Sequence, residues 1–296
     1  MHYYNNNTII YLNGSFVKAK DSVIDLYGQT LHYGYGAFEG IRAYKTHNNT
    51  RIFKAEKHYT RLKQSCELIN IPYLWDNEQL IKATYELLNM NGYKNAYIRP
   101  LVFCGKNMSL GRPTEVSIMI CAWEWEAYLG NNLLRVCISS FQQPNPKSIK
   151  VGAKTTGYYI NSILASTEAK ALGFDEALLL DMNENVAEAP GANFFLEKDG
   201  CLYTPPEGNI LPGITRATVF EIGEILGIEV IEKHLNLKDI EKADSAFLCG
   251  TATEIVGIKS INEKIFETQW HETLGSTIQR TYKNLVLEKE NYEVII

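Results

Sequence analysis

Residues 8–18 read TIIYLNGSFVK, and this stretch decides how the fold begins. Two strand-like runs, Thr8–Leu12 and Phe16–Lys18, flank the dipeptide Asn13-Gly14. Asn-Gly tolerates positive φ at both central positions of a tight turn, which is the geometry that joins two twisted antiparallel strands. We therefore predict a β-hairpin, and with it an antiparallel start to the first sheet.

Beyond this hairpin the chain alternates between strand-like and helix-like patterns. A second hairpin is predicted where Ile41–Tyr44 and Arg51–Phe53 surround a polar tip at residues 47–49. Two segments with apolar residues at helical spacing follow, marked by His58, Leu62, Cys66 and Ile69 and then by Leu80, Ile81, Ala83, Leu87 and Leu88. Strand-like sequence returns at Ala96–Cys104 and Glu115–Trp123. Strands, helices and strands in this order predict an α+β domain.

The second half of the chain predicts another mixed set of elements. We expect strands at Leu134–Ser139, Glu176–Asp181, Asn193–Glu197, Cys201–Tyr203, Ser245–Gly250 and Glu254–Ile258, and helices at Ile160–Leu172, Thr215–Leu226 and Leu274–Leu287. The small and turn-forming residues of Trp125–Asn132 favour a connection between two domains. We therefore predict a small domain at residues 1–126, a linker at 127–136 and a larger domain at 137–296.

The composition excludes several classes of function. The net charge is −5 with both signs interspersed, which argues against a nucleic-acid partner. Apolar runs fall short of the ~20 residues that span a bilayer, and the N-terminal residues lack the pattern of a secretory signal, so we expect a cytoplasmic protein without a membrane anchor. The six cysteines and six histidines are dispersed, without the spacing of a disulfide framework or of metal ligands. No metal is expected.

Lys154 lies in VGAKTTGYY, residues 151–159, after a probable strand and before a helix. A lysine in a loop is most often a solvated surface charge, so this segment alone does not indicate catalysis. A lysine that attacks a carbonyl must be close to neutral and shielded from water. Small neighbours in a tight loop provide that setting.

Two turns are suited to bind an oxyanion. Residues 209–216, NILPGITR, place Pro-Gly directly before a helix, so the free N–H groups of its first turn can point at an anion. The alternative is an ordinary helix start with Thr215 as N-cap. Residues 249–254, CGTATE, form a second small-residue turn after a buried strand. Neither has the spacing of a nucleotide-binding loop.

Glu188 opens EAPGANFF, residues 188–195, where a carboxylate precedes a constrained turn and an apolar strand. A glutamate at such a place is normally exposed to solvent. Buried beside a pyridine nitrogen, it would keep that nitrogen protonated.

Taken together, these segments resemble the branched-chain amino acid aminotransferases, which are fold-type IV pyridoxal-phosphate enzymes of the class IV aminotransferase family. Six blocks run in family order over nearly the whole chain: residues 31–42 (LHYGYGAFEGIR), 97–100 (YIRP), 152–154 (GAK), 188–194 (EAPGANF), 211–216 (LPGITR) and 250–252 (GTA). The resemblance implies an α+β fold of two domains, with a small α/β N-terminal domain and a larger C-terminal domain that has a mixed, β-barrel-like core.

The resemblance also implies a cofactor site for pyridoxal 5'-phosphate. Lys154 matches the lysine that holds the cofactor as a Schiff base and then moves protons during the reaction. The remaining cofactor residues implied are Arg61, Ile214, Thr215 and Thr251 at the phosphate, Tyr159 at the ring hydroxyl and Glu188 at the ring nitrogen.

For the substrates, the resemblance implies L-leucine, L-isoleucine or L-valine in one half-reaction and 2-oxoglutarate, giving L-glutamate, in the other. The substrate residues implied are Tyr97, Thr251 and Ala252 at the α-carboxylate, Arg99 at the distal carboxylate of glutamate, and Tyr33, Phe38, Gly40, Trp125 and Tyr128 in the apolar pocket. Tyr33 and the loop near Leu110 match segments that reach across a dimer interface in relatives, so a homodimer or a higher homo-oligomer is expected.

Two departures from the family pattern concern the surroundings of the site. The family's usual EGSGEN is EAPGAN here, so Ala192 replaces a second acidic residue and Pro190 stiffens the turn. The loop Lys106–Pro113 is shorter than in the relatives considered, which affects the expected size of the substrate pocket.

Two alternatives stay open at the level of sequence. A D-amino acid or amine transaminase, or an aminodeoxychorismate lyase, would share Lys154, Glu188 and Arg61, but the Tyr97–Pro100 block favours the branched-chain group. A non-catalytic ligand-binding protein of the same fold is the other alternative, and the presence of Lys154, Tyr159 and Glu188 together argues against it.

Overall fold

The computed structural model describes residues 3–47, 49–125 and 132–288. Its helices are α1 Gln29–Tyr33, α2 Ala55–Leu68, α3 Asn77–Asn91, α4 Tyr159–Ala171, α5 Ile214–Leu226, α6 Leu237–Glu241 and α7 Leu274–Leu287, with 3-10 turns at Ala19–Asp21 and Trp270–Glu272. Its strands are β1 Ile9–Leu12, β2 Ser15–Lys18, β3 Gly36–Phe38, β4 Ile41–Lys45, β5 Thr50–Ile52, β6 Ala96–Cys104, β7 Val116–Trp123, β8 Leu134–Ile138, β9 Glu176–Leu178, β10 Glu188–Ala189, β11 Ala192–Lys198, β12 Cys201–Thr204, β13 Val230–Glu232, β14 Ser245–Gly250, β15 Glu254–Ile261 and β16 Lys264–Ile265.

The chain forms two compact units, which are described separately below. Unit 1 comprises Met1–Glu126 together with Ala153–Tyr158, and unit 2 comprises Ala127–Gly152 together with Tyr159–Ile296. The sequence-based division assigns the short segment at 153–158 to the second domain, whereas in the structure it packs with unit 1. The domain bounds inferred from sequence stay a prediction.

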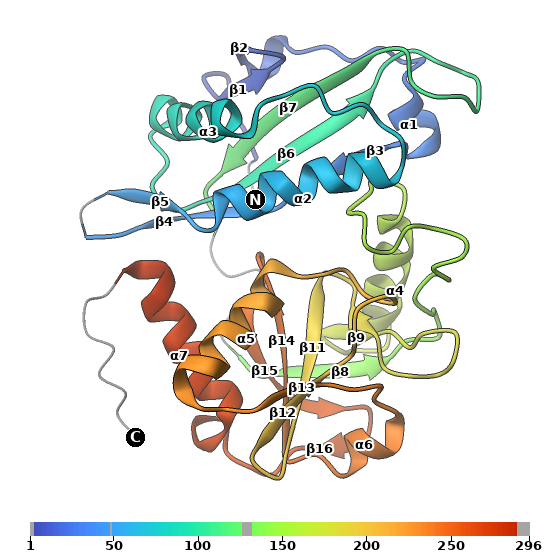
Figure 1. Ribbon diagram of the computed structural model, residues 1–296, viewed down its shortest axis with the longest axis vertical. Helices are drawn as coiled ribbons and strands as arrows, with labels where there is room; N and C mark the ends of the chain where they lie inside the picture. The colour runs from blue at the N-terminus through green and yellow to red at the C-terminus, as the bar shows by residue number, and fades with distance from the viewer. Residues whose placement is uncertain (1–2, 48, 126–131, 289–296) are drawn as a thin grey trace. The chain divides into compact units, whose positions relative to one another are not determined.

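Unit 1 is built on an antiparallel sheet whose strands lie in the order β2-β1-β7-β6-β4-β5, with β3 paired to β6 (Figure 1). The first predicted hairpin is confirmed, because Leu12 pairs with Ser15 and both turn residues have positive φ, 47° at Asn13 and 94° at Gly14. The second hairpin is confirmed by β4 and β5, although Asn48 of its tip lies outside the described residues.

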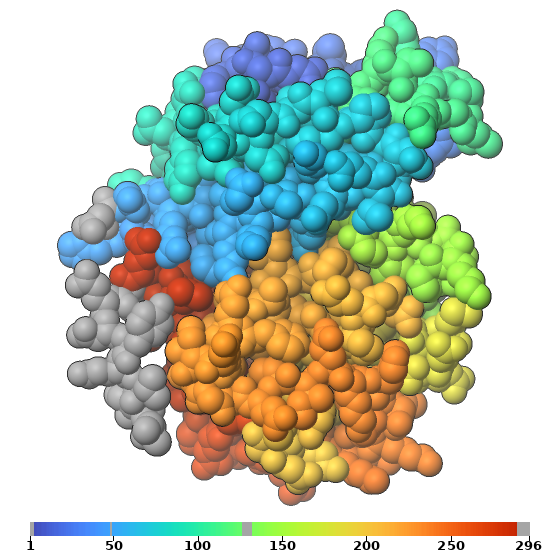
Figure 2. All heavy atoms as spheres, in the orientation of Figure 1, coloured from blue at the N-terminus to red at the C-terminus, as the bar shows by residue number. Residues whose placement is uncertain are grey.

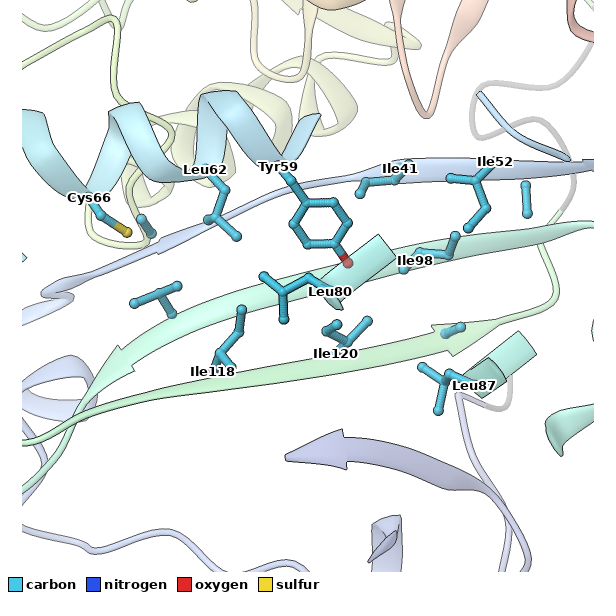
Figure 3. Close-up of a cluster of buried hydrophobic side chains, with 14 of the residues drawn as sticks. Ile41, Ile52, Tyr59, Leu62, Cys66, Leu80, Leu87, Ile98, Ile118 and Ile120 are labelled. Carbon is cyan, nitrogen blue, oxygen red and sulfur yellow. The ribbon is translucent and has the colours of Figure 1, made fainter. Parts of the chain in front are cut away.

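The two predicted helices of unit 1 are confirmed as α2 and α3, which pack together against the sheet (Figure 1) and form much of the surface of unit 1 on the side shown in Figure 2. Figure 3 shows side chains of these helices meeting those of β4, β6 and β7 in one buried cluster that includes Ile41, Tyr59, Leu62, Cys66, Leu80, Ile98, Ile118 and Ile120. A fully buried side chain of this size contributes about 1.5–3 kcal/mol relative to an exposed one. The apolar helix faces are therefore what hold α2 and α3 on the sheet.

Unit 2 contains a mixed sheet in the order β13-β12-β11-β14-β15-β8-β9, with β10 paired to β11 and β16 to β15. Three of its strand pairs are parallel, namely β12–β13, β15–β8 and β8–β9. Helices α5 and α7 pack on each other and on β14 and β15. The α+β class and the mixed core are thus confirmed, but within residues 132–288 the strands follow an open path and do not close into a barrel.

The helices of the described ranges were also compared with the length needed to cross a bilayer. None of them combines the length and the apolar character that a membrane span requires.

Candidate active site

Lys154 lies in the segment 153–158, which is bonded to two elements of unit 1. Its backbone N–H donates to Ser65 Oγ of α2 at 3.0 Å, and its carbonyl accepts from the Phe38 N–H of β3, also at 3.0 Å. Thr156 donates through its N–H to the Gly36 carbonyl at 2.9 Å and through Oγ1 to the Gly34 carbonyl at 2.5 Å. These bonds fix the backbone of the lysine before any ligand is considered.

The close approach behind this arrangement requires glycine. Gly34 has φ of 62°, and a Cβ placed there would lie 2.5 Å from the Gly157 Cα. Such a contact is far inside van der Waals distance, and the φ value itself disfavours an L side chain. Gly34 therefore allows the Lys154 segment to lie directly against α1 and β3.

The Lys154 amine is poised close to neutrality. Burial lowers the pKa of the amine from 10.5 to about 8, the positive charge of Arg61 adds to this effect, and the Glu39 carboxylate opposes it. Its Nζ lies 5.0 Å from the centroid of the Phe38 ring. A lysine with this pKa has an appreciable neutral fraction at physiological pH, which is what an amine needs to attack a carbonyl.

Arg61 belongs to a buried network with Glu39 and His58. Its Nε and Nη2 donate to the two oxygens of Glu39 at 2.6 and 2.9 Å, and His58 Nδ1 lies 2.8 Å from Glu39 Oε2. Burial opposes ionisation of Glu39, but Arg61 and His58 outweigh it and hold the pKa of the carboxyl far below its usual range. Burial lowers the pKa of His58, so a neutral imidazole donates from Nδ1 to the carboxylate. The bidentate bond fixes the plane of the guanidinium.

Sequence reasoning gave no role to Glu39 or His58. Glu39 is an acidic residue inside an otherwise apolar strand region, and it is 0% exposed in the structure. A buried carboxylate has to be paired, so its position in the sequence was a usable signal for a cationic partner. His58 was interpreted only as part of a helix face.

The proposed substrate residues of unit 1 gather on one face of its sheet. Tyr97 of β6 is flanked across the strands by Arg42 of β4 and Trp123 of β7, and its ring meets Trp125 edge-on at 4.7 Å. Arg99 Nη2 donates to Tyr97 Oη at 3.4 Å. Aromatic walls and an arginine on one face are suited to hold a ligand with an apolar body and a carboxylate.

Phe38 joins this face to Lys154. The Arg99 Cζ lies 4.6 Å from the centroid of the Phe38 ring, the same ring that lies 5.0 Å from Lys154 Nζ. Gly40 lies directly against Tyr97, since a Cβ added there would come 1.9 Å from Tyr97 Oη. The structure therefore brings Phe38, Gly40, Tyr97 and Arg99 into the neighbourhood of the amine.

Tyr33 and Tyr128 are the two remaining pocket residues inferred from sequence. Tyr33 ends α1, is 44% exposed and donates from Oη to the Met108 carbonyl at 3.1 Å. It thus lies against the loop between β6 and β7. Tyr128 lies outside the described residues.

Glu188 of unit 2 is buried and held by hydrogen bonds. Its Oε1 accepts from Gln143 Nε2 at 2.6 Å and from the Leu211 N–H at 3.1 Å, and its Oε2 accepts from Asn193 Nδ2 at 3.0 Å. The expectation of an ordinary solvent-facing glutamate is therefore wrong, and the buried alternative holds. Gln143 carried no signal in the sequence.

The predicted oxyanion turns of unit 2 have the expected backbone. Gly213 is the N-cap of α5 in an extended conformation, and Ile214 and Thr215 begin the helix. The alternative in which Thr215 caps the helix is wrong, because Thr215 lies inside the first turn and no side chain caps the helix. The first N–H groups of a helix have no intrahelical acceptor, so those of Ile214 and Thr215 are suited to bind phosphate. Thr251 and Ala252 form the turn between β14 and β15, and Tyr159 begins α4.

The residues present fit pyridoxal 5'-phosphate, the cofactor implied by the resemblance. Unit 1 carries an amine whose pKa is lowered by burial and an arginine locked in a bidentate bond. Unit 2 carries a buried carboxylate and a helix start that offers free amides. An aldehyde, a phosphate and a pyridine nitrogen each find a chemically matched group in this set.

Comparisons with known proteins agree with this chemistry. The family described as amino-transferase class IV matches residues 36–261. The branched-chain-amino-acid aminotransferase of Pseudomonas aeruginosa is 36% identical over 287 residues, which cover 95% of this chain and 94% of that protein. The branched-chain aminotransferase of Thermoproteus uzoniensis, solved with norvaline, is 36% identical with a TM-score of 0.91 over 96% of both chains.

A third relative has been solved with a cofactor derivative. The branched-chain amino acid aminotransferase of T.th., complexed with N-(5'-phosphopyridoxyl)-L-glutamate, is 34% identical, with a TM-score of 0.88 over 95% of both chains. The resemblance inferred from sequence is confirmed by this agreement of family, sequence and fold. The chain therefore belongs to the class IV aminotransferase family.

Proposed function

We propose that this protein transfers the amino group of L-leucine, L-isoleucine or L-valine to 2-oxoglutarate, with pyridoxal 5'-phosphate bound covalently to Lys154. The observation that carries the proposal is the Lys154 amine, whose pKa of about 8 suits it to attack an aldehyde. Support for the substrates comes from relatives named for branched-chain amino acids, which are similar to this chain over almost its full length.

Lys154 has two roles in this proposal. Its neutral amine attaches the cofactor, and once substrate has displaced it the same amine moves a proton to and from the substrate α-carbon. When bound, pyridoxal phosphate supplies an electron sink that stabilises negative charge at that carbon. The bonds from Ser65 and Phe38 keep the Lys154 backbone in place during both steps.

Residues of both units hold the cofactor in the proposal. Arg61, with the Ile214 and Thr215 amides and the Thr251 hydroxyl, binds the phosphate. Tyr159 hydrogen-bonds the ring hydroxyl, and Glu188 keeps the ring nitrogen protonated. Support for this chemistry comes from the relative solved with a phosphopyridoxyl derivative of glutamate.

The substrate pocket alternates between two kinds of side chain. Phe38, Trp125 and Tyr128 with Gly40 and Tyr33 accept the branched apolar group, while Arg99 receives the distal carboxylate of glutamate. Tyr97, Thr251 and Ala252 bind the α-carboxylate that both substrates share. We further propose that the protein acts in the cytoplasm as a homodimer or higher homo-oligomer.

A panel of amino donors tests the proposal. The purified protein is supplied with pyridoxal phosphate and 2-oxoglutarate, and formation of L-glutamate is followed with L-leucine, L-isoleucine, L-valine and D-alanine. We expect glutamate from the three L-amino acids and none after Lys154→Ala. Turnover of D-alanine without turnover of L-leucine would favour a D-amino acid transaminase, and no turnover with any donor would favour a binding protein.

A further inference from the structure

We infer that Gln143 is a positioning residue that holds Glu188 ionised and in a fixed orientation. This inference rests on the proposed function, in which Glu188 is the partner of the cofactor ring nitrogen. Gln143 lies in the loop after β8, is 5% exposed and is anchored by its backbone N–H, which donates to the Leu180 carbonyl at 2.8 Å. Its side chain reaches a residue 45 positions away in the sequence.

The hydrogen bond from Gln143 is the shortest of those that hold Glu188. Gln143 Nε2 donates to Glu188 Oε1 at 2.6 Å, whereas the Leu211 N–H and Asn193 Nδ2 donate at 3.1 and 3.0 Å. Both carboxylate oxygens are therefore engaged, and Gln143 and Leu211 share Oε1. Donors aimed at both oxygens fix the rotation of a carboxylate as well as its position.

The donors differ in kind from those around Glu39. Gln143, Asn193 and Leu211 are neutral, whereas Glu39 is bound by the Arg61 cation. Neutral donors favour the ionised carboxylate without cancelling its charge. Glu188 thus keeps a full negative charge to offer to a protonated ring nitrogen.

Asn193 has additional structural work, which makes Gln143 the better residue to test. Asn193 Nδ2 also donates to the Leu211 carbonyl at 3.0 Å, and a Cβ on Gly213 would come 1.9 Å from Asn193 Oδ1. A change at Asn193 would therefore disturb the start of α5 as well as Glu188. Within the described part of unit 2, the Gln143 side chain makes its hydrogen bond to Glu188 alone.

Other ionisable groups close to this network do not take over the role of Gln143. Cys249 of β14 lies on the strand paired with β11, and its burial raises the pKa of its thiol, with Arg216 opposing and Glu188 reinforcing that effect. The thiol is therefore neutral at physiological pH. Arg216 is a permanent cation whose Nη2 bonds to the Pro205 carbonyl and to Glu232.

The first experiment reads the ionisation of Glu188 in the full-length protein. The chain is labelled with ¹³C-carboxyl glutamate, and infrared difference spectra are recorded against pH, without cofactor and after adding pyridoxal phosphate. The Glu188 band is assigned by its loss in Glu188→Gln. Gln143→Leu keeps most of the volume but removes the donor, and the exposed neighbour Gln142→Leu is the matched control.

We expect Gln143→Leu to raise the pKa of Glu188 by about one to two units, because a hydrogen bond to a charged group is lost, and Gln142→Leu to leave it unchanged. Gln143→Glu, which preserves size if the leucine variant does not fold, should raise it further because two carboxyls would share one proton. An unchanged Glu188 titration in the Gln143 variants overturns the inference even if the cofactor binds. A raised pKa in protein that binds no cofactor supports the clamp and removes the proposed function instead.

Discussion

The charge of the Lys154 amine is set by two neighbours that act in opposite directions. Arg61 disfavours the protonated amine and Glu39 favours it, while burial contributes the largest effect and lowers the pKa. Arg61 and Glu39 are themselves joined by a bidentate bond, so they act on Lys154 as a nearly neutral pair. The reactive amine is thereby close to neutrality without an isolated charge beside it.

This balance predicts how cofactor uptake depends on pH. Because the pKa of the folded state is lowered to about 8, the amine is protonated below and neutral above that pH. The rate of covalent cofactor uptake by cofactor-free protein should therefore rise about tenfold per pH unit up to pH 8 and then level off. In Glu39→Gln the favourable charge is lost, and the midpoint should fall by about one unit.

The measurement is the growth of the cofactor absorbance band after rapid mixing, at a series of pH values. Glu56→Gln, an exposed glutamate near the start of the same helix as Arg61, is the control and should keep the midpoint of the parent protein. A midpoint that moves upward in Glu39→Gln contradicts the assignment.

At the scale of elements, the register of β4, β6 and β7 determines which side chains meet. Arg42, Tyr97 and Trp123 are cross-strand partners, so they share one face of the sheet because facing residues of paired strands point to the same side. Gly40 precedes β4 and leaves room for the Tyr97 ring. The absence of a side chain at Gly40 is thus part of how the face is built.

Gly40→Ala should displace Tyr97 without unfolding the sheet. The added methyl group would lie 1.9 Å from Tyr97 Oη and 2.7 Å from Cζ, so the ring has to move. A shift of about 1 Å at a substrate-positioning group commonly costs up to 10²-fold, so we expect kcat/KM for L-leucine to fall 10- to 100-fold.

Steady-state kinetics with L-leucine would measure this loss, and thermal unfolding would verify the fold. Gly191→Ala is the matched control, because a Cβ at this exposed glycine has no neighbour within 4 Å. Equal kinetics in the two variants would count against a role for Tyr97 in substrate binding.

Elements with local signals were predictable from sequence, and elements formed by distant partners were not. The first hairpin follows from Asn13-Gly14, and α2 and α3 follow from their helical periodicity. The short α1 and β3 were missed, because β3 exists through its pairing with β6 and the Thr156 segment bonds to the carbonyls beside it. Strand β9 ends at Leu178, three residues earlier than predicted.

The same limit applies to the site. Lys154, Arg61 and Glu188 lie in segments with recognisable composition, so they could be named from sequence. Gln143 has no such signal, because its partner is 45 residues away and is reached only when unit 2 folds. Spacing rules detect neighbours on one element, whereas the polar partners of a buried carboxylate are set by tertiary structure.

At the scale of the whole molecule, unit 1 carries a row of exposed apolar residues that the proposed homodimer would cover. Val23 is 93%, Leu26 71%, Tyr27 67% and Leu110 91% exposed. The loop containing Leu110 is tied to this region, since the Asn107 N–H donates to the Tyr27 carbonyl at 3.1 Å (Figure 1). Exposed apolar residues that cluster in this way are typical of a protein interface.

Leu110→Asp should weaken the dimer. Burying a leucine contributes about 1.5–3 kcal/mol, and a buried aspartate adds a desolvation cost, so the dissociation constant should rise at least about tenfold. Sedimentation velocity over a range of concentrations would measure it. Leu74→Asp, at a position 70% exposed elsewhere in unit 1, should leave the dimer intact. A dimer equally stable in both variants would place the interface elsewhere.

The central claim is that Lys154 holds a cofactor that cycles between a branched-chain amino acid and 2-oxoglutarate. The most direct measurement is the near-ultraviolet and visible absorbance spectrum of the protein with pyridoxal phosphate, before and after adding L-leucine and then 2-oxoglutarate. We predict that L-leucine bleaches the band of the bound aldehyde form and that 2-oxoglutarate restores it. A protein that forms no such band with pyridoxal phosphate, or a band that L-leucine leaves unchanged, would contradict the claim.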